Sequence, residues 1–362
     1  MKKRIVFIIS SLTSGGAERV VTTLANELVQ NFDVKIIQLY KSQPFYKLNK
    51  KIKLDYCRES FDPNFNIYKS ITNHFFMVRK IYKILRQDSD ITIGFTTTSN
   101  IYTVIASRLL KKPCIISERN NPRYNINNKY WNYIRKKTYP FASKIIIQTE
   151  DIKQYYLKTI ENDKLKILSN PIDPELSKHL NNNVFQKENI VLNVGRLNKQ
   201  KNQELLIKAF SNIPHIGWKL LIAGEGNQRE FYQKTINELN EQENIRLLGR
   251  ISSIQNEYSK AKVFAFTSNY EGFPNALIEA MYYGLPCVST DCPTGPSELI
   301  EHNKNGFLIP MNNQKILEEK LIKLMTDETL RKTFGDNAKI RTRDFEASNI
   351  ADEWSKLITE LI

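Results

Sequence analysis

The sequence predicts an α/β protein built from two doubly wound parallel sheets. Short runs rich in Val, Ile and Leu alternate with segments that carry apolar residues at helical spacing, and this alternation occurs twice along the chain. A chain of 362 residues is also long for a single hydrophobic core. Two Rossmann-like domains in tandem are expected to face a central cleft at the carboxyl ends of their strands.

The first alternation predicts an amino-terminal Rossmann-like domain over residues 1–172. Residues 4–10 form a buried strand, and the Ser-Gly-Gly turn at residues 14–16 leads into an amphipathic helix. Further strands, with helices between them, are expected at residues 34–39, 91–95, 114–117 and 144–148.

A break in the pattern separates the two halves. Two prolines and a run of asparagines stop regular structure, which predicts a linker over residues 173–188. The second domain is expected over residues 189–345, with strands at residues 190–194, 218–223, 245–248, 263–266 and 286–290. An amphipathic helix at residues 346–362 follows, and we expect it to pack back on the amino-terminal domain.

The net charge of +15 is confined to one half of the chain. Residues 1–180 hold 31 Lys and Arg against 15 Asp and Glu, whereas the remaining residues hold 22 against 23. Only the first half is therefore expected to meet an anionic partner. No nucleic-acid motif accompanies this charge, so a nucleic-acid partner is not expected.

Two basic segments rich in aromatic residues, 66–86 and 123–144, account for much of that charge. Basic amphipathic helices with aromatic side chains suit an anionic membrane surface or the diphosphate of a lipid-linked acceptor. A solvated helix face is the alternative interpretation. The candidate contacts are Lys69, Arg79, Lys80, Lys83 and Arg86.

The cysteines and the apolar runs indicate a cytoplasmic protein. Four scattered cysteines have neither zinc nor redox spacing, which favours a reducing compartment. The apolar run within residues 1–12 is short and lacks a cleavage site, so a signal peptide is not expected. No run approaches the roughly 20 apolar residues that span a bilayer, so membrane contact is expected to be peripheral.

The segment NVGRLNKQKN at residues 193–202 joins an expected strand to an expected helix. Gly195 permits a tight turn, and Arg196 and Lys201 stand beside the amino end of the helix. Two cations at this position predict a diphosphate clamp. Taken alone, the segment fits a solvated basic loop equally well.

The segment NYEGFPNALIEA at residues 269–280 places two carboxylates eight positions apart. Glu271 lies in a loop, and Glu279 lies in a helix begun by Pro274 and Asn275. Carboxylates in these positions can accept hydrogen bonds from sugar hydroxyls and from a ribose diol. Isolated glutamates are more often solvated or capping residues, but their spacing together with the flanking residues makes coincidence a poor explanation.

With these motifs the chain resembles glycosyltransferase family 4, the retaining GT-B enzymes that use nucleotide sugars. The resemblance spans nearly the whole chain, and the two glutamates separated by seven residues are its most specific motif. The other matching segments are SGGAER at 14–19, GRL and Lys at 195–201, AGEG at 223–226, LLGR at 247–250 and GLPCVSTDCPTGPSELI at 284–300.

The resemblance implies a role for each matching residue. Arg196 and Lys201 would hold the donor diphosphate in place of a metal ion, so neither a metal nor a cofactor is expected. Glu271 would contact the donor sugar, and it is expected to be a catalytic residue together with Arg196 and Lys201. The remaining donor-binding residues would be Glu279 at the ribose, Gly15 and Gly16 at the diphosphate, and Gly249, Arg250 and Ile251 at the base.

The chain departs from the family at Arg119, where many members carry His. A guanidinium stays protonated and cannot act as a general base. Arg119, with the preceding Glu118, is instead expected to contact the acceptor or the donor sugar. The Asp88-Ser89-Asp90 triplet fits the metal-binding pattern of GT-A transferases, but it precedes a strand and is interpreted as a turn and cap.

The expected function is retaining transfer of a sugar from a UDP-sugar to a polyprenyl-diphosphate-linked saccharide, in bacterial surface polysaccharide or glycan assembly. An N-acetylhexosamine is the working choice of sugar. The resemblance implies front-side displacement, with the departing phosphate helping to deprotonate the acceptor. The alternatives are a GT-B-fold UDP-sugar epimerase and a non-catalytic nucleotide-sugar-binding protein.

Overall fold

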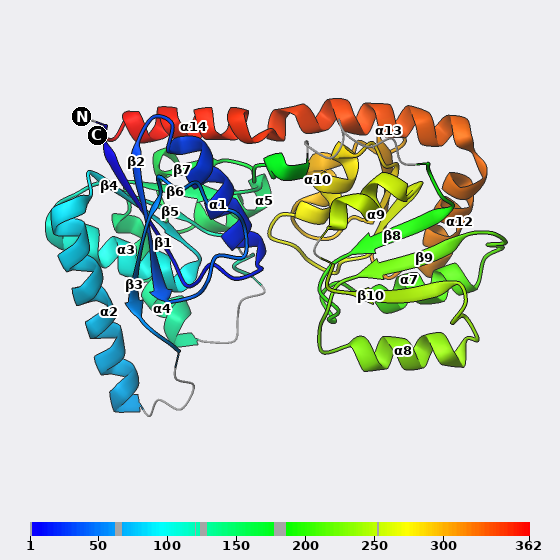
Figure 1. The fold of residues 1–362 in the computed structure, drawn as a ribbon, viewed down its shortest axis with the longest axis horizontal. Coiled ribbons are helices and arrows are strands. Elements are labelled where there is room, and N and C mark those ends of the chain that lie inside the picture. The colour runs from blue at the N-terminus through cyan, green and yellow to red at the C-terminus, as the bar shows by residue number, and fades with distance from the viewer. Residues whose placement is uncertain (1, 62–66, 120, 124–128, 177–185, 252) are drawn as a thin grey trace. The chain divides into compact units, whose positions relative to one another are not determined.

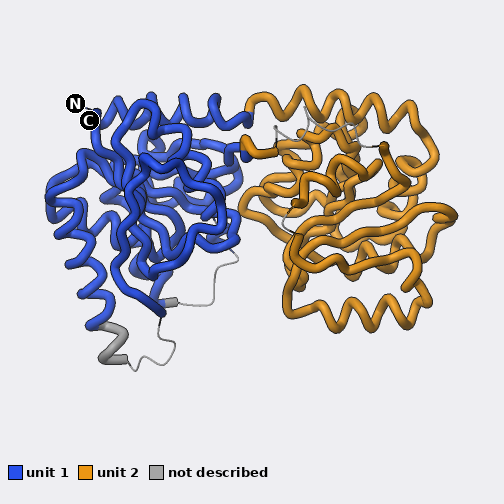
Figure 2. The backbone as a smooth tube through the Cα atoms, in the orientation of Figure 1, with its two compact units in different colours: residues 1–173, 345–362 blue, residues 174–344 orange. Residues whose placement is uncertain are grey.

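The computed structural model describes residues 2–61, 67–119, 121–123, 129–176, 186–251 and 253–362, without the side chains of 67–71 and 129. The chain forms two compact units (Figure 2). Unit 1 consists of Met1–Asp173 and Phe345–Ile362, and unit 2 consists of Pro174–Asp344. Most of the segment expected as a linker, residues 173–188, lies outside the described residues.

Unit 1 contains a seven-stranded parallel sheet with the order β3-β2-β1-β4-β5-β6-β7 (Figure 1). The strands expected from the sequence are confirmed, and two further strands, β3 and β7, occupy its edges. The strands are β1 (Arg4–Ile9), β2 (Asp33–Tyr40), β3 (Lys53–Arg58), β4 (Ile91–Phe95), β5 (Cys114–Ser117), β6 (Lys144–Ile147) and β7 (Leu165–Ile167).

Helices cover both faces of this sheet, as a parallel sheet requires. The helices are α1 (Gly16–Leu28), α2 (Ile67–Asp88), α3 (Thr97–Leu110), α4 (Lys129–Thr138), α5 (Glu150–Tyr156) and α14 (Ala347–Thr359), with 3₁₀ turns at Tyr139–Phe141 and Asn162–Lys164. A further 3₁₀ turn, Arg343–Phe345, spans the chain boundary between the two units. Residues of α1 and α14 share one buried cluster, and residues of α2, α3 and α5 share another. The carboxyl-terminal helix is therefore part of unit 1.

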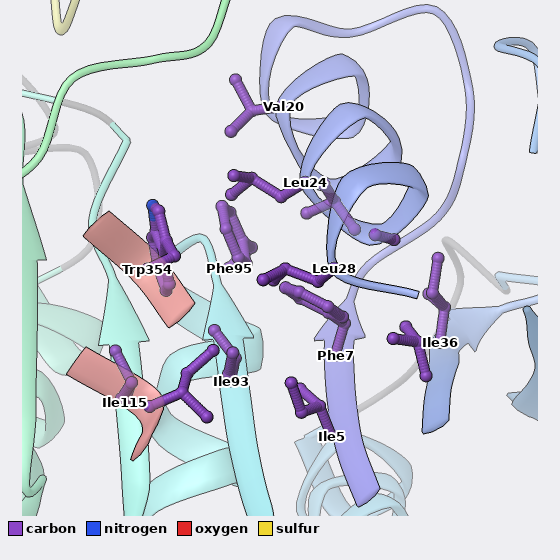
Figure 3. Close-up of a cluster of buried hydrophobic side chains, with 14 of the residues drawn as sticks. Ile5, Phe7, Val20, Leu24, Leu28, Ile36, Ile93, Phe95, Ile115 and Trp354 are labelled. Atoms are coloured by element: carbon purple, nitrogen blue, oxygen red, sulfur yellow. The ribbon is translucent and has the colours of Figure 1, made fainter. Parts of the chain in front are cut away.

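The central strand β1 contributes to both clusters because successive side chains of a strand point to opposite faces. Ile5 and Phe7 belong to the cluster beneath α1 and α14, whereas Val6 belongs to the opposite cluster. Trp354 of α14 is fully buried, and its ring stacks on Phe95 with centroids 5.9 Å apart (Figure 3). The last helix thus completes the core of the first sheet.

Unit 2 contains a six-stranded parallel sheet with the order β10-β9-β8-β11-β12-β13. The strands are β8 (Ile190–Val194), β9 (Lys219–Ala223), β10 (Ile245–Gly249), β11 (Val263–Phe266), β12 (Cys287–Thr290) and β13 (Gly306–Ile309). The helices are α7 (Gln203–Ser211), α8 (Arg229–Glu238), α9 (Ile254–Lys260), α10 (Asn275–Tyr282), α11 (Pro296–Leu299), α12 (Gln314–Thr326) and α13 (Glu328–Thr342).

Each sheet has one point at which the order of its strands reverses. This point lies between β1 and β4 in unit 1 and between β8 and β11 in unit 2. Loops that leave such neighbouring strands at their carboxyl ends diverge to opposite faces and leave room for a ligand. The loops after β8 and β11 hold the clamp motif and the first glutamate of the pair.

Replacing Trp354 with Ala is expected to destabilise unit 1 by about 3–5 kcal/mol, because it removes a large buried side chain that the surrounding core cannot refill. Urea unfolding followed by far-UV circular dichroism measures the loss. Glu353→Ala, at an exposed neighbouring position of the same helix, is the matched control. Equal unfolding midpoints for the two variants would contradict this account of α14.

Glu27 of α1 is expected to weaken the fold at neutral pH. Burial, with a smaller contribution from Asp352, raises the pKa of the Glu27 carboxyl above its ordinary value of 4.5. A carboxyl whose pKa is higher in the folded state than in the unfolded state stabilises the fold at a pH below its unfolded pKa. This stabilisation is lost as the pH rises through the folded pKa. Glu27→Gln should therefore raise the melting temperature at pH 7, with a gain that shrinks towards pH 4. A pH-independent difference would refute this explanation.

Candidate functional site

The loop between β8 and α7 carries the predicted clamp. The Gly195 amide donates to the carbonyl of Ala223 at 3.0 Å, and the Leu197 amide donates to the carbonyl of Glu225 at 3.0 Å. Leu197 is fully buried, whereas the Arg196 side chain is exposed. The loop is therefore anchored at its centre, and Arg196 is left at the surface.

Two glycines after β9 allow this loop to pack closely. Gly224 has a φ of +146°, and a Cβ atom there would lie 1.9 Å from the Gly195 carbonyl oxygen. A Cβ atom on Gly226 would lie 2.1 Å from the carbonyl oxygen of Leu197. Any side chain at either position would displace the clamp loop, which explains the Gly-Glu-Gly sequence physically.

Lys201 and Glu271 form an ion pair at the strand-order reversal of unit 2. Lys201 Nζ lies 2.6 Å from Glu271 Oε1, and the two side chains are 19% and 6% exposed. The ammonium also lies 5.0 Å from the centroid of the Phe266 ring, which is a favourable cation–π position. A cation and a carboxylate distant in sequence are thus held together in a largely dehydrated place.

Hydrogen bonds between the two loops fix this pair. The Asn269 amide donates to the Gln200 carbonyl at 2.8 Å, and the Gln200 side chain donates to the Tyr270 carbonyl at 2.9 Å. The Thr267 hydroxyl donates to the Lys201 carbonyl at 3.1 Å. The backbones on either side of the ion pair are therefore joined directly.

The loop after β12 supports Glu271 from a third direction. The Glu271 amide donates to the Pro293 carbonyl at 3.3 Å, and the Thr294 hydroxyl donates to the Glu271 carbonyl. Cys292 lies beside this loop, and burial, with the nearby Glu271 carboxylate adding to it, raises the pKa of its thiol to about 12. Cys292 is therefore a protonated packing residue at neutral pH.

Glu279 lies within α10 and is buried. The Tyr258 hydroxyl donates to Glu279 Oε2 at 3.2 Å. Gly249, with a φ of +74°, ends β10, and its carbonyl accepts from the Gly224 amide at 2.8 Å. Arg250 is exposed and Ile251 is half-buried. The residues predicted in this half of the chain to bind the nucleotide-sugar donor therefore all belong to unit 2.

In unit 1, Gly15 caps the amino end of α1, and Gly16 is the first residue of that helix. The Gly15 carbonyl accepts from the Arg19 amide at 3.1 Å. A Cβ atom on Gly15 would lie 2.0 Å from a carboxylate oxygen of Glu18. This glycine therefore lets an acidic side chain fold against the positive end of the helix.

Glu118 and Arg119 follow β5 and are both buried. Glu118 Oε2 accepts from the Tyr139 hydroxyl at 2.8 Å, and the Thr97 hydroxyl lies 3.2 Å from the same oxygen. Burial, with Glu118 adding to it, raises the pKa of Tyr139 well above its usual range, so Tyr139 stays a donor. Tyr139 and Thr97 were not expected from the sequence, because no fixed spacing links them to Glu118.

Arg119 is the less satisfied of the two side chains. Its Nη1 donates to Asn170 Oδ1, and its guanidinium carbon lies 4.8 Å from the Phe95 ring centroid. Among the described residues, its Nε and Nη2 atoms have no hydrogen-bond partner. Burial lowers the pKa of Arg119 to about 9, against the opposing effect of Glu118. The guanidinium remains charged at neutral pH with two donors unused.

The basic residues predicted to contact a membrane or a lipid diphosphate lie on α2. Arg79, Lys83 and Arg86 are exposed, and Lys80 is half-buried. The Lys69 side chain lies outside the described part. The exposed Phe75 lies on the same helix. The second basic segment is less uniform, because Arg135 of α4 is only 2% exposed.

The Asp88 and Asp90 carboxylates lie at the amino end of β4. Asp88 pairs with Lys35, and Arg4 Nη2 lies 2.9 Å from Asp90 Oδ1. Within the described ranges, no group of three or more His, Cys, Asp or Glu side chains is arranged to hold a metal ion. In the same ranges, no helix combines the length and apolar character needed to cross a membrane.

Family comparisons match both halves of the chain. Residues 177–341 match the family "Glycosyl transferases group 1", and residues 14–176 match "Glycosyltransferase Family 4". A Campylobacter jejuni relative is 35% identical, over 99% of each chain. Its name is "GalNAc-alpha-(1->4)-GalNAc-alpha-(1->3)-diNAcBac-PP-undecaprenol alpha-1,4-N-acetyl-D-galactosaminyltransferase". The "Amylovoran biosynthesis glycosyltransferase AmsD" of Erwinia amylovora is 27% identical, over 99% of this chain and 100% of its own.

Solved structures share the same fold. Anabaena Alr3699/HepE in complex with UDP has a TM-score of 0.82 and 19% identity, covering 99% of this chain and 100% of its own. TarM has a TM-score of 0.79 and 18% identity, covering 99% and 98%. The fold is therefore GT-B, and the sequence relatives favour a transferase over the epimerase alternative. The chain belongs to the glycosyltransferase family that joins a Family 4 amino-terminal region to a group 1 carboxyl-terminal region.

Proposed function

We propose that this glycosyltransferase moves a sugar from a UDP-sugar to a saccharide carried on a polyprenyl diphosphate, with retention and without a metal ion. The observation that carries the proposal is the ion pair of Lys201 and Glu271 at the strand-order reversal of unit 2. A second Campylobacter jejuni relative, 31% identical, is named for an acceptor that contains diphospho-undecaprenol. The Anabaena protein of the same fold binds UDP.

Unit 2 receives the donor in this proposal. Arg196 and Lys201 neutralise the diphosphate as it leaves, a role that cations fulfil by electrostatic stabilisation. Lys201 is already oriented by Glu271 and by the Phe266 ring, so little side-chain entropy is lost when the donor binds. Glu271 also accepts from the donor sugar. The other donor contacts are Glu279 at the ribose, Gly249, Arg250 and Ile251 at the base, and Gly15 and Gly16 of unit 1 at the diphosphate.

Unit 1 receives the acceptor, and Arg119 is its main polar contact. A buried donor without a partner costs about 1–3 kcal/mol. The two unused nitrogens of Arg119 are explained if a hydroxyl or phosphate oxygen of a substrate accepts from them. Asn170 holds this guanidinium through Nη1, and the nearby Glu118 carboxylate, itself held by Tyr139, favours its charged form. The departing phosphate then takes the acceptor proton.

The basic face of α2 supports the further proposal that the enzyme works at the inner face of the cell membrane. Arg79, Lys83 and Arg86 are exposed, and Phe75 on the same helix is 71% exposed. Exposed cations next to exposed aromatic rings favour an anionic lipid surface. In this proposal Lys69 and Lys80 also contact the lipid surface or the lipid diphosphate, and the protein is cytoplasmic and peripheral to the membrane.

Lys201→Ala and Glu271→Ala are each expected to lower the transfer rate by about 10²–10³, because each removes a charge that acts on the leaving group or the sugar. The assay measures UDP release from a panel of UDP-sugars, with and without a polyprenyl-diphosphate-linked acceptor. Lys199→Ala, an exposed lysine in the same loop, is the matched control. EDTA should leave the rate unchanged.

Four outcomes would count against the proposal. UDP release that needs no acceptor would contradict transfer, and release that EDTA abolishes would contradict the metal-independent mechanism. Tight binding of a UDP-sugar without turnover would support the non-catalytic alternative. Full activity in the folded Lys201→Ala variant would reject the clamp assignment.

Arg119→Met is expected to lower kcat/KM at least tenfold while leaving the melting temperature unchanged or higher. A buried guanidinium with two unused donor atoms destabilises the folded state, so its removal should not lower the melting temperature. The same substitution removes the proposed contact to the substrate, so it should lower activity. Steady-state kinetics with varied acceptor and a thermal melt measure the two effects. A variant that loses stability but keeps full activity would show that Arg119 is only structural.

A further inference from the structure

The strongest unexplained feature of unit 1 is a cavity between α4 and α5. It measures about 90 Å³ and opens to solvent, which is room for several water molecules at roughly 10–15 Å³ each. The residues lining it are Arg135, Lys136, Tyr139, Tyr155, Tyr156, Lys158, Thr159 and Ile160. No Asp or Glu side chain is among them.

Arg135 is built into the wall of this cavity. Its side chain is 2% exposed, and Nη2 donates to the Tyr155 hydroxyl at 3.4 Å, a long contact. Its Nη1 atom has no hydrogen-bond partner in the part of the chain that the structure describes. A buried guanidinium nitrogen normally has a partner, because an unpaired charged donor is costly. The position of Arg135 therefore calls for an acceptor.

Two further cationic side chains, those of Lys136 and Lys158, line the cavity. Lys136 precedes the end of α4, Lys158 follows α5, and both side chains are exposed. A guanidinium and two ammonium groups together match a group with several acceptor oxygens and more than one negative charge. A carboxylate, with two oxygens and one charge, would leave part of this set unused.

We propose that the cavity between α4 and α5 binds a phosphate group, held by Arg135, Lys136 and Lys158. The phosphate comes either from a phospholipid headgroup or from a soluble anion. Tyr139 and Tyr156, in the wall of the cavity, donate to Glu118 at 2.8 and 3.5 Å. These two tyrosines therefore contact both the cavity and the Glu118 carboxylate. None of the residues of this site belongs to the proposed donor clamp. The phosphate-site proposal can therefore be tested separately from the proposed transfer reaction.

The test compares two charge-matched double variants of the full chain. Lys136→Gln with Lys158→Gln removes the two exposed cations of the cavity. Lys137→Gln with Lys153→Gln removes two nearby lysines, one from α4 and one from α5, at positions that do not line it. Arg135→Gln is a third variant, used only if its melting temperature equals that of the wild type, because Arg135 is buried.

Binding is measured in two arms that separate the possible sources. Calorimetric titration with inorganic phosphate tests a soluble anion, and co-sedimentation with phosphatidylglycerol vesicles tests a lipid headgroup, with phosphatidylcholine vesicles as the neutral reference. In at least one arm, the cavity variant should bind at least tenfold more weakly than the control variant, a loss expected for charged hydrogen bonds. The arm that shows the loss identifies the source.

Equal binding by the two double variants in both arms would overturn the proposal, and so would no binding by the wild type in either arm. Phosphate that binds only in the donor clamp gives equal affinities for the two double variants, because both keep Arg196 and Lys201. That outcome also counts against the cavity. A loss of transferase activity in Lys201→Ala has no bearing on this comparison.

Discussion

The ion pair of Lys201 and Glu271 explains much of the local structure of unit 2. Both groups are largely dehydrated, so separating them would leave an uncompensated charge at considerable cost. The two loops that carry them are accordingly hydrogen-bonded to one another. Gly224 and Gly226 let the loop after β9 pack closely against the loop that carries Lys201. The reversal of strand order brings the loops together, and Lys201 and Glu271 are therefore close enough to form the ion pair.

In unit 2 the sequence indicates which loops bring the candidate residues together, whereas in unit 1 it does not, for a physical reason. Lys201 and Glu271 sit in loops that directly follow buried strands, so the strand pattern places them at one edge of the sheet. The partners of Glu118 come from α3, from a 3₁₀ turn and from α5, at no recurring spacing. Such a network depends on how the helices pack, which periodicity alone does not specify.

The strands that the sequence analysis did not predict all lie at the edge of a sheet. β3 and β7 lie at the edges of their sheet, and β13 lies at an edge of the other. An edge strand has one neighbour, so it tolerates charged residues, as in β3, or only three residues, as in β7. The central strands are buried on both faces and therefore read as continuous apolar runs.

The carboxyl-terminal helix places a constraint on how the protein is made. Unit 1 begins at the amino terminus, yet Trp354 lies in its core, and the whole of unit 2 is encoded between the two. During synthesis unit 2 is complete before α14 leaves the ribosome, because a chain emerges from its amino-terminal end. The first domain in the sequence is thus the last to be completed, and a chain that stops before Trp354 leaves part of the apolar core of unit 1 uncovered.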